Sequence, residues 1–266
     1  MRPYKTGGYA KKSLGQNFLI DEKVIAGIIA SLEVSKGDSV LEIGPGRGAL
    51  TSGLLDAGAD LTALEIDREL VPRLNLEFAQ RDNFRCIEGD VLEVDLRSIV
   101  HDPPAKLVGN LPYYISTAIL QKLSEQRQIF SRIVLMLQKE VVDRIVAKPG
   151  DSSRGYLTVL IEDAFESMRL FDVPPSAFVP RPKVESTVVL LVPRKSTVGD
   201  EMLFREIAGF SFAQKRKTIL NNLKHKIEDA EYHLAEASID PRRRAETLTS
   251  AEWAALVDTI AKKKEP

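Results

Sequence analysis

The sequence predicts an α/β fold with a doubly wound, mostly parallel sheet, followed by a small all-helical domain. Three observations lead to this prediction. Short apolar runs alternate with segments of helical periodicity up to Pro193. A glycine-rich turn at residues 44–48 follows one of the first runs and opens a helix. Beyond Pro193 only the helical pattern continues.

Seven short apolar runs are predicted as strands, at residues 39–43, 60–66, 84–87, 105–108, 132–137, 165–173 and 185–192. Helical patterns follow four of them, at residues 50–57, 69–80, 117–126 and 139–147. No predicted helix separates the last two runs, and the final run is rich in β-branched residues. We therefore expect these two strands to form an antiparallel hairpin at the sheet edge.

The C-terminal part is predicted to be a separate helical domain. Residues 194–200 are polar and resemble a linker, and apolar residues at helical spacing follow them. Thr249 and Glu252 form the pattern of a capping box that opens a last helix. We expect one domain at residues 1–198 and a second at residues 199–266.

The composition is that of an ordinary globular protein, with 266 residues, 44% hydrophobic and 28% charged. No apolar run approaches the roughly 20 residues that span a bilayer, and the basic, polar start of the chain does not resemble a secretory signal. The single cysteine and the three dispersed histidines show no ligand spacing. We expect a cytoplasmic protein without a metal site and without membrane attachment.

The net charge of −1 conceals segregated basic stretches. Residues 211–226 carry five basic side chains and no acidic one, and residues 181–195 carry four basic side chains and one acidic one. Such stretches are typical of nucleic-acid contacts, and they are equally typical of solvated faces. Charge alone leaves both interpretations open.

The turn from Glu42 to Gly48 is the candidate cofactor site, since glycines let the backbone approach a ligand closely. Gly44 and Gly46 also satisfy the dinucleotide fingerprint, which makes NAD a rival ligand. Pro45 removes one N–H from that turn, and Glu42 places a negative charge before it. Both features disfavour a diphosphate and favour a cationic ligand such as S-adenosylmethionine.

Two further carboxylates support that interpretation. Glu65 ends the second predicted strand and can accept hydrogen bonds from both ribose hydroxyls, and Asp90 follows the third strand and can accept from the adenine amino group. Carboxyl ends of parallel strands meet at one edge of a sheet, where such folds bind ligands. A glycine turn with capping acids and no ligand remains the structural alternative.

Asn110, Leu111, Pro112 and Tyr113 end the fourth predicted strand and form an Asn/Asp-Pro-Pro-Tyr-type motif of amino-methylating enzymes. An adenine N6 is a poor nucleophile because its lone pair is delocalised into the ring. The Asn110 amide oxygen and the Leu111 carbonyl can accept its two N–H groups, and Tyr113 can stack on the base. The alternative is a strand-ending turn with buried aromatic residues.

These motifs and three others, in their order along the chain, resemble the small-subunit ribosomal RNA adenine dimethyltransferase family, which is associated with kasugamycin sensitivity. Besides those described, they are an N-terminal motif at residues 12–19, a proline-rich loop at residues 174–184 and a segment at residues 212–218 that resembles the start of a helix. The resemblance implies a class I, Rossmann-like methyltransferase sheet. It places Phe178 on the target adenine, beside Asn110, Leu111 and Tyr113. The implied cofactor contacts are Asn17, Leu19, Glu42, Gly44, Gly46, Glu65, Ile66, Asp90, Val91 and Asn110, and the implied RNA contacts are Arg181, Lys183, Lys215, Arg216 and Lys217.

The resemblance also implies the reaction. Two adjacent adenines near the 3′ end of 16S rRNA would each receive two methyl groups from S-adenosylmethionine, in a pre-assembled small ribosomal subunit, and the enzyme would act as a monomer. The related large-subunit enzyme of macrolide resistance is the nearest alternative; Arg181 to Lys183 and the basic segment ending at Lys217 favour the small-subunit enzyme. A non-enzymatic assembly factor is the alternative from another class, and the intact Asn110 and Glu65 argue for retained catalysis.

Overall fold

The computed structural model describes residues 10–11 and 14–264, and it confirms the predicted α/β fold. Its main sheet contains seven strands in the order β4 (Phe84–Glu88), β3 (Asp60–Glu65), β2 (Ser39–Ile43), β5 (Ala105–Asn110), β6 (Phe130–Gln138), β9 (Ser186–Pro193) and β7 (Phe165–Val173). The first five pair in parallel, and β9 pairs antiparallel with β6. The last strand of the chain therefore inserts between β6 and β7, and all seven predicted strands are present.

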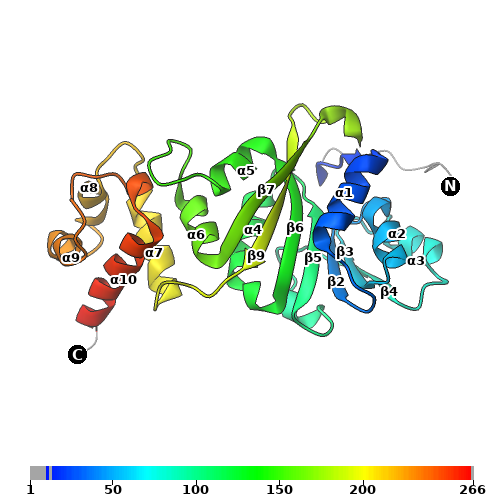
Figure 1. The fold of residues 1–266 in the computed structure, drawn as a ribbon, viewed down its shortest axis with the longest axis horizontal. Helices are drawn as coiled ribbons and strands as arrows, with labels where there is room; N and C mark the ends of the chain where they lie inside the picture. The colour runs from blue at the N-terminus through cyan, green and yellow to red at the C-terminus, as the bar shows by residue number, and fades with distance from the viewer. Residues whose placement is uncertain (1–9, 12–13, 265–266) are drawn as a thin grey trace. The chain divides into compact units, whose positions relative to one another are not determined.

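Helices cover both faces of this sheet, with α1 (Glu22–Leu32) and α2 (Ala49–Asp56) on one face and α4 (Ser116–Glu125) on the other (Figure 1). Helix α3 (Val71–Glu77) packs beside β4. Helix α1 was not predicted, although Asp21 caps it by accepting the N–H groups of Lys23 and Val24. Its buried residues Ile28 and Leu32 pack toward β5 and β6, which completes that layer.

A second, two-stranded sheet joins segments that are far apart in the sequence. Strand β1 (Phe18–Leu19) pairs antiparallel with β8 (Phe178–Val179), and the Ile20 N–H donates to the Ala177 carbonyl at 2.9 Å. The short 3₁₀ turn η4 (Pro175–Ala177) leads into β8. Residues 14–20, which we call the N-terminal segment, are thereby attached to the proline-rich loop.

The C-terminal helices are α7 (Glu201–Ser211), α8 (Ile219–Leu223), α9 (Ala230–Glu236) and α10 (Ser250–Lys264). The predicted capping box is confirmed: the Thr249 N–H donates to the Glu252 carboxylate at 2.8 Å, and the Glu252 N–H donates to the Thr249 hydroxyl at 3.3 Å. The helices enclose a core in which Phe204 and Trp253 meet edge to face, 6.1 Å apart.

The contacts divide the chain into two compact units. The division differs from the expected domain boundary at residue 198. One unit comprises residues 1–139 and 169–191, and the other comprises residues 140–168 and 192–266. The second unit takes in most of α5 (Lys139–Ile145) and the unpredicted α6 (Tyr156–Ala164). Val159 and Leu160 of α6 explain this, because they are buried in the same hydrophobic cluster as Trp253. We refer to these as the sheet unit and the helical unit.

The basic residues Lys215, Arg216 and Lys217 correct one expectation, because they lie on a turn and not on a helix. Helix α7 ends at Ser211, and α8 begins only after Thr218, whose hydroxyl accepts the Asn221 N–H at 3.3 Å. All three basic side chains are exposed. Within residues 10–11 and 14–264, none of the helices is long and apolar enough to cross a membrane.

Candidate functional site

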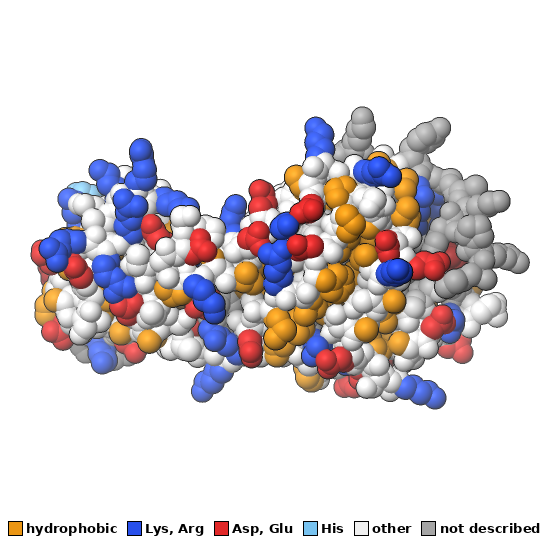
Figure 2. Space-filling view, turned by 45° about the horizontal axis from the view of Figure 1, so that its top comes forward, with side chains coloured by type: hydrophobic (Ala, Val, Ile, Leu, Met, Phe, Trp, Pro, Cys, Tyr) orange, Lys and Arg blue, Asp and Glu red, His pale blue; other side chains and the backbone are white. Residues whose placement is uncertain are grey.

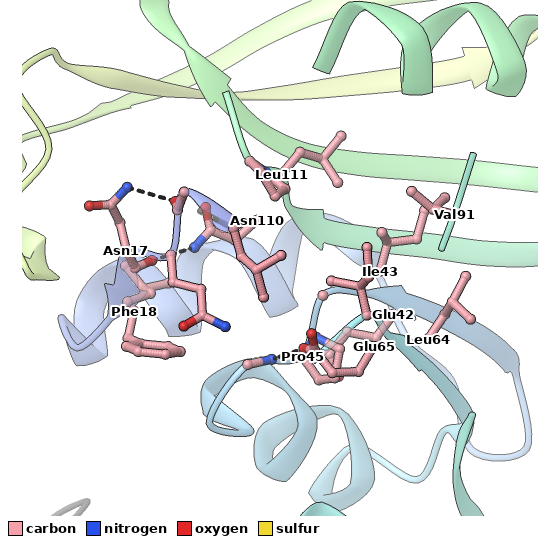
Figure 3. Close-up of a pocket in the computed structure, with 18 of the residues that line it drawn as sticks. Asn17, Phe18, Glu42, Ile43, Pro45, Leu64, Glu65, Val91, Asn110 and Leu111 are labelled. Atoms are coloured by element: carbon pink, nitrogen blue, oxygen red, sulfur yellow. Dashed lines mark hydrogen bonds between the residues drawn. The ribbon is translucent and has the colours of Figure 1, made fainter. Parts of the chain in front are cut away.

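A cavity of about 280 Å³ lies at the carboxyl ends of β2, β3, β4 and β5, within the sheet unit (Figure 3). Its walls include residues 14–20, the turn after β2, the residues that end or follow the other three strands, and Val179 of β8. This size is near the lower end for small-molecule sites, which span roughly 300–1,000 Å³. The sheet edge predicted to bind a cofactor therefore has a formed pocket.

The glycine turn shapes one wall because its backbone adopts conformations that other residues disfavour. Gly44 and Gly46 have φ values of +68° and +59°. A side chain at Gly46 would also place its Cβ 3.2 Å from the Phe18 ring. Both glycines line the cavity, as predicted for a turn that lets a ligand approach the backbone.

Glu65 is the central buried carboxylate of the site, with 4% of its surface exposed. One oxygen accepts the Gly46 N–H at 3.0 Å, and the other accepts the Asp67 N–H at 2.9 Å. Burial raises the pKa of Glu65, and these backbone hydrogen bonds act in the opposite direction. The carboxylate thus ties the glycine turn to the end of β3.

Glu42 lies deeper in the same wall and is 1% exposed. The Thr51 hydroxyl donates to its Oε2 at 2.7 Å. Burial, with a smaller contribution from the charge of Glu65, raises the pKa of Glu42 to about 7. Two acidic groups with raised pKa values, close together in one pocket, favour a ligand that carries positive charge.

The Asn110 side chain is oriented by the N-terminal segment. Its Nδ2 donates to the main-chain carbonyl of Asn17 at 3.1 Å (Figure 3). A carbonyl only accepts hydrogen bonds, so this contact distinguishes the two ends of the amide and leaves Oδ1 as the acceptor end. Leu111 is 1% exposed, and its N–H donates to the Met136 carbonyl, which places the motif firmly on the end of β5.

Tyr113 lines the cavity and is half-buried. Its hydroxyl lies 2.7 Å from the Ser186 hydroxyl at the start of β9, which fixes the position of the ring. Burial raises the pKa of Tyr113 above its ordinary value, and the hydrogen bond with Ser186 acts in the opposite direction.

The N-terminal segment is held by a group that the sequence pattern did not single out. Asp67 accepts hydrogen bonds from the Lys11 ammonium at 2.7 Å and from the Gln16 side chain at 2.9 Å. The Lys11 N–H also donates to the Gln16 Oε1 at 2.8 Å. The sequence did contain a signal for Asp67, because this acid follows Glu65 by two residues and therefore lies at the same edge of the sheet. We call Lys11, Gln16 and Asp67 the latch.

The remaining predicted residues are placed as follows. Asn17, Leu19, Ile66, Asp90 and Val91 all line the cavity. One Asp90 oxygen accepts the Leu92 N–H at 2.8 Å. By contrast, Phe178 is 1% exposed and is not among the lining residues, whereas its neighbour Val179 is.

The predicted RNA contacts lie outside the cavity. Arg181 and Lys183 are exposed on the proline-rich loop, and Lys215 to Lys217 belong to the helical unit. Among the residues that the structure describes, no group of three or more His, Cys, Asp and Glu side chains is arranged to hold a metal ion.

Glu42→Gln should remove a pH dependence from the stability of the cofactor-free protein. The native pKa of Glu42, about 7, lies above its ordinary value of 4.5, so the native state binds the proton more tightly. The free energy of unfolding of the wild type therefore falls between pH 5 and pH 8, by roughly 2–3 kcal/mol from this group. Glutamine does not titrate and can still accept from Thr51.

Denaturant unfolding at several pH values, followed by circular dichroism, measures this difference. Glu88→Gln is the matched control, because Glu88 is an exposed carboxylate that ends β4 in the same sheet. A stability difference between wild type and Glu42→Gln that stays constant from pH 5 to pH 8 would contradict the assignment.

The chain is similar to known proteins over nearly its whole length. The family described as ribosomal RNA adenine dimethylase matches residues 8–262. A protein of Geobacter sulfurreducens named ribosomal RNA small subunit methyltransferase A is 45% identical over 261 residues, which cover 93% of this chain and 94% of that protein. A protein of the same name from a Geobacillus species is 42% identical, with 96% and 93% covered.

Solved structures extend the similarity to the fold. A dimethyladenosine transferase from Plasmodium falciparum superposes with a TM-score of 0.78 at 25% identity and covers 92% of this chain and 98% of its own. The 23S rRNA methyltransferase ErmE gives a TM-score of 0.70 at 26% identity, with 92% and 100% covered. The match of a family profile to nearly the whole sequence, together with relatives above 40% identity, is decisive: this chain belongs to the ribosomal RNA adenine dimethylase family.

Proposed function

We propose that this protein transfers methyl groups from S-adenosylmethionine to N6 of two adjacent adenines near the 3′ end of 16S rRNA, within the small ribosomal subunit. Each adenine would receive two methyl groups. The observation that carries the proposal is the Asn110 amide, whose orientation is set by the Asn17 carbonyl in the same pocket as Glu65.

The residues of the pocket fit S-adenosylmethionine. Glu65 can accept the ribose hydroxyls, Asp90 can accept the adenine amino group, and Ile66 and Val91 offer apolar contact to the adenine ring. The buried charge of Glu42 favours the cationic end of the ligand. The bound cofactor would supply an electrophilic methyl group on its sulfonium sulfur.

Asn110 and Leu111 would prepare the nucleophile. The Asn110 Oδ1 and the Leu111 carbonyl accept the N6–H groups, which draws the nitrogen lone pair out of conjugation with the ring and toward the methyl carbon. The cofactor would supply its methyl group to N6, its thioether would be the leaving group, and the N6 proton would pass to solvent water. Tyr113, fixed through Ser186, would stack on the adenine.

We also propose that Phe178 stacks on the target adenine, although this buried side chain must first become accessible. Its ring is 1% exposed and its backbone pairs with Leu19, so the β1–β8 contact must shift before the ring can meet a base. The proposed aromatic pair would then form only when RNA is bound.

The basic side chains are proposed to contact phosphates of the rRNA. Lys and Arg side chains are spread over the visible face of the helical unit, with acidic side chains among them (Figure 2). Lys215, Arg216 and Lys217 are exposed residues of the helical unit, and Arg181 and Lys183 are exposed residues of the sheet unit. We also propose that the protein acts in the cytoplasm as a monomer, without a metal ion.

Glu65→Ala should weaken S-adenosylmethionine binding. Loss of a carboxylate that accepts two hydroxyls costs roughly 1.5–3 kcal/mol, which corresponds to a roughly 10- to 150-fold rise in Kd. Isothermal titration calorimetry measures the change, and Glu88→Ala on the adjacent strand should leave Kd unchanged. Unchanged affinity in Glu65→Ala would remove Glu65 from the cofactor site.

Asn110→Ala and Phe178→Leu should both bind S-adenosylmethionine but transfer methyl groups slowly. Leucine keeps apolar volume at the buried position and removes the aromatic face, so loss of stacking should slow transfer by roughly 5- to 150-fold. Asn110→Ala should be slower still, because the amide orients the nucleophile itself. Single-turnover transfer to unmethylated small subunits is the test.

Two results of that assay would count against the proposal. Transfer at the wild-type rate by Asn110→Ala would contradict the proposed catalytic role of the pocket. Transfer at the wild-type rate by Phe178→Leu would assign Phe178 to the packing of the proline-rich loop alone.

Neutralising Lys215, Arg216 and Lys217 together should lower the salt dependence of binding to the small subunit. Removal of one cation from a phosphate reduces the slope of log K against log salt by about 1, so a fall of about 2 to 3 is expected. Neutralising the exposed Lys36, Arg81 and Arg97 of the sheet unit is the charge-matched control. Equal slopes for the two triple variants would mean that Lys215 to Lys217 are only a solvated face.

A further inference from the structure

Tyr114 is an exposed aromatic side chain at the pocket. It lines the cavity, yet 61% of its surface is accessible, whereas the adjacent Tyr113 is half-buried and bonded to Ser186. The proposed reaction uses Tyr113 for the target adenine and leaves Tyr114 without a role. An exposed ring at the mouth of a site is a feature that binding can use.

The Tyr114 ring lies against Gly15. A Cβ at residue 15 would lie 3.3 Å from both Cδ1 and Cε1 of the ring, so the absence of a side chain lets the ring rest against the N-terminal segment. Gly15 has φ +61°, which other residues disfavour. Lys11 and Gln16 of the latch fix the position of that segment through hydrogen bonds. The exposed Tyr114 ring therefore rests on a part of the chain that is itself held in place.

The surroundings of Tyr114 suit a nucleotide. Ile20 and Val179 also line the cavity, and they are 47% and 49% exposed, which extends the apolar rim. Two and four residues beyond Val179, the exposed side chains of Arg181 and Lys183 supply positive charge. An apolar rim with cations near it matches a base with its phosphates.

We propose that Tyr114 stacks on the nucleotide adjacent to the adenine that enters the pocket. The inference rests on the proposed function and adds a contact to its substrate. A base that leaves its strand deprives its neighbour of a stacking partner, and an exposed aromatic ring replaces that partner. Where two adjacent adenines are modified, this neighbour is itself a purine, which offers a large stacking surface.

The test combines variants of Tyr114 with a change in the neighbouring base. Tyr114→Ala and Tyr114→Phe are compared with Leu76→Ala, which truncates an 80% exposed apolar side chain of the sheet unit that does not line the cavity. Substrates are unmethylated small subunits with the natural adenine pair and subunits in which one adenine of the pair is replaced by uridine. Single-turnover transfer to the remaining adenine is measured by primer extension, and S-adenosylmethionine affinity by calorimetry.

On natural subunits, Tyr114→Ala should slow transfer by about 5- to 150-fold, while Tyr114→Phe and Leu76→Ala stay within about twofold of wild type. Cofactor affinity should not change in any of them. The uridine replacement should slow the wild type more than it slows Tyr114→Ala, because only the wild type has a ring at residue 114 on which the purine can stack.

Two outcomes would overturn the inference. If wild type transfers methyl groups to adenine and Tyr114→Ala does so equally fast, or with the same sensitivity to the neighbouring base, Tyr114 does not stack there, although the proposed function stands. If wild type transfers no methyl to adenine N6, the proposed function fails and the inference fails with it.

Discussion

The site depends on one buried carboxylate and the two backbone N–H groups that hold it. Glu65 accepts from Gly46 and from Asp67, so the glycine turn and the end of β3 keep a fixed relation to each other. The hydrogen bonds offset part of the cost of burying the charge, although the pKa of Glu65 remains raised. A ligand whose hydroxyls donate to this carboxylate would relieve more of that cost, as the ribose hydroxyls of the proposed cofactor would.

The same region is connected to Asn110 through a series of contacts. Asp67 follows Glu65 and binds Lys11 and Gln16, which places the N-terminal segment across the sheet edge. The carbonyl of Asn17 in that segment then orients the Asn110 amide. In the proposed reaction, cofactor binding and orientation of the nucleophile would therefore share one support, since movement of the segment would disturb both at once.

Local pattern was sufficient to predict the strands, the glycine turn and the carboxylates at their ends, because parallel strands bring those ends to one edge. Contacts between distant segments were not predictable in this way. The Lys11–Asp67 pair joins residues 56 positions apart. The burial of Phe178 follows from the pairing of β8 with β1, and two-residue strands leave almost no periodicity to detect. Helix α6 was missed and joins the helical unit because its apolar residues pack with Trp253.

Methyl transfer to the amino group of adenine in this pocket can be measured by nucleoside mass spectrometry, after unmethylated small subunits have been incubated with the protein and S-adenosylmethionine that carries a deuterated methyl group. We predict labelled N6,N6-dimethyladenosine at two adjacent positions near the 3′ end of the 16S rRNA. Label in another nucleoside, or no label in the RNA, would contradict the proposed function.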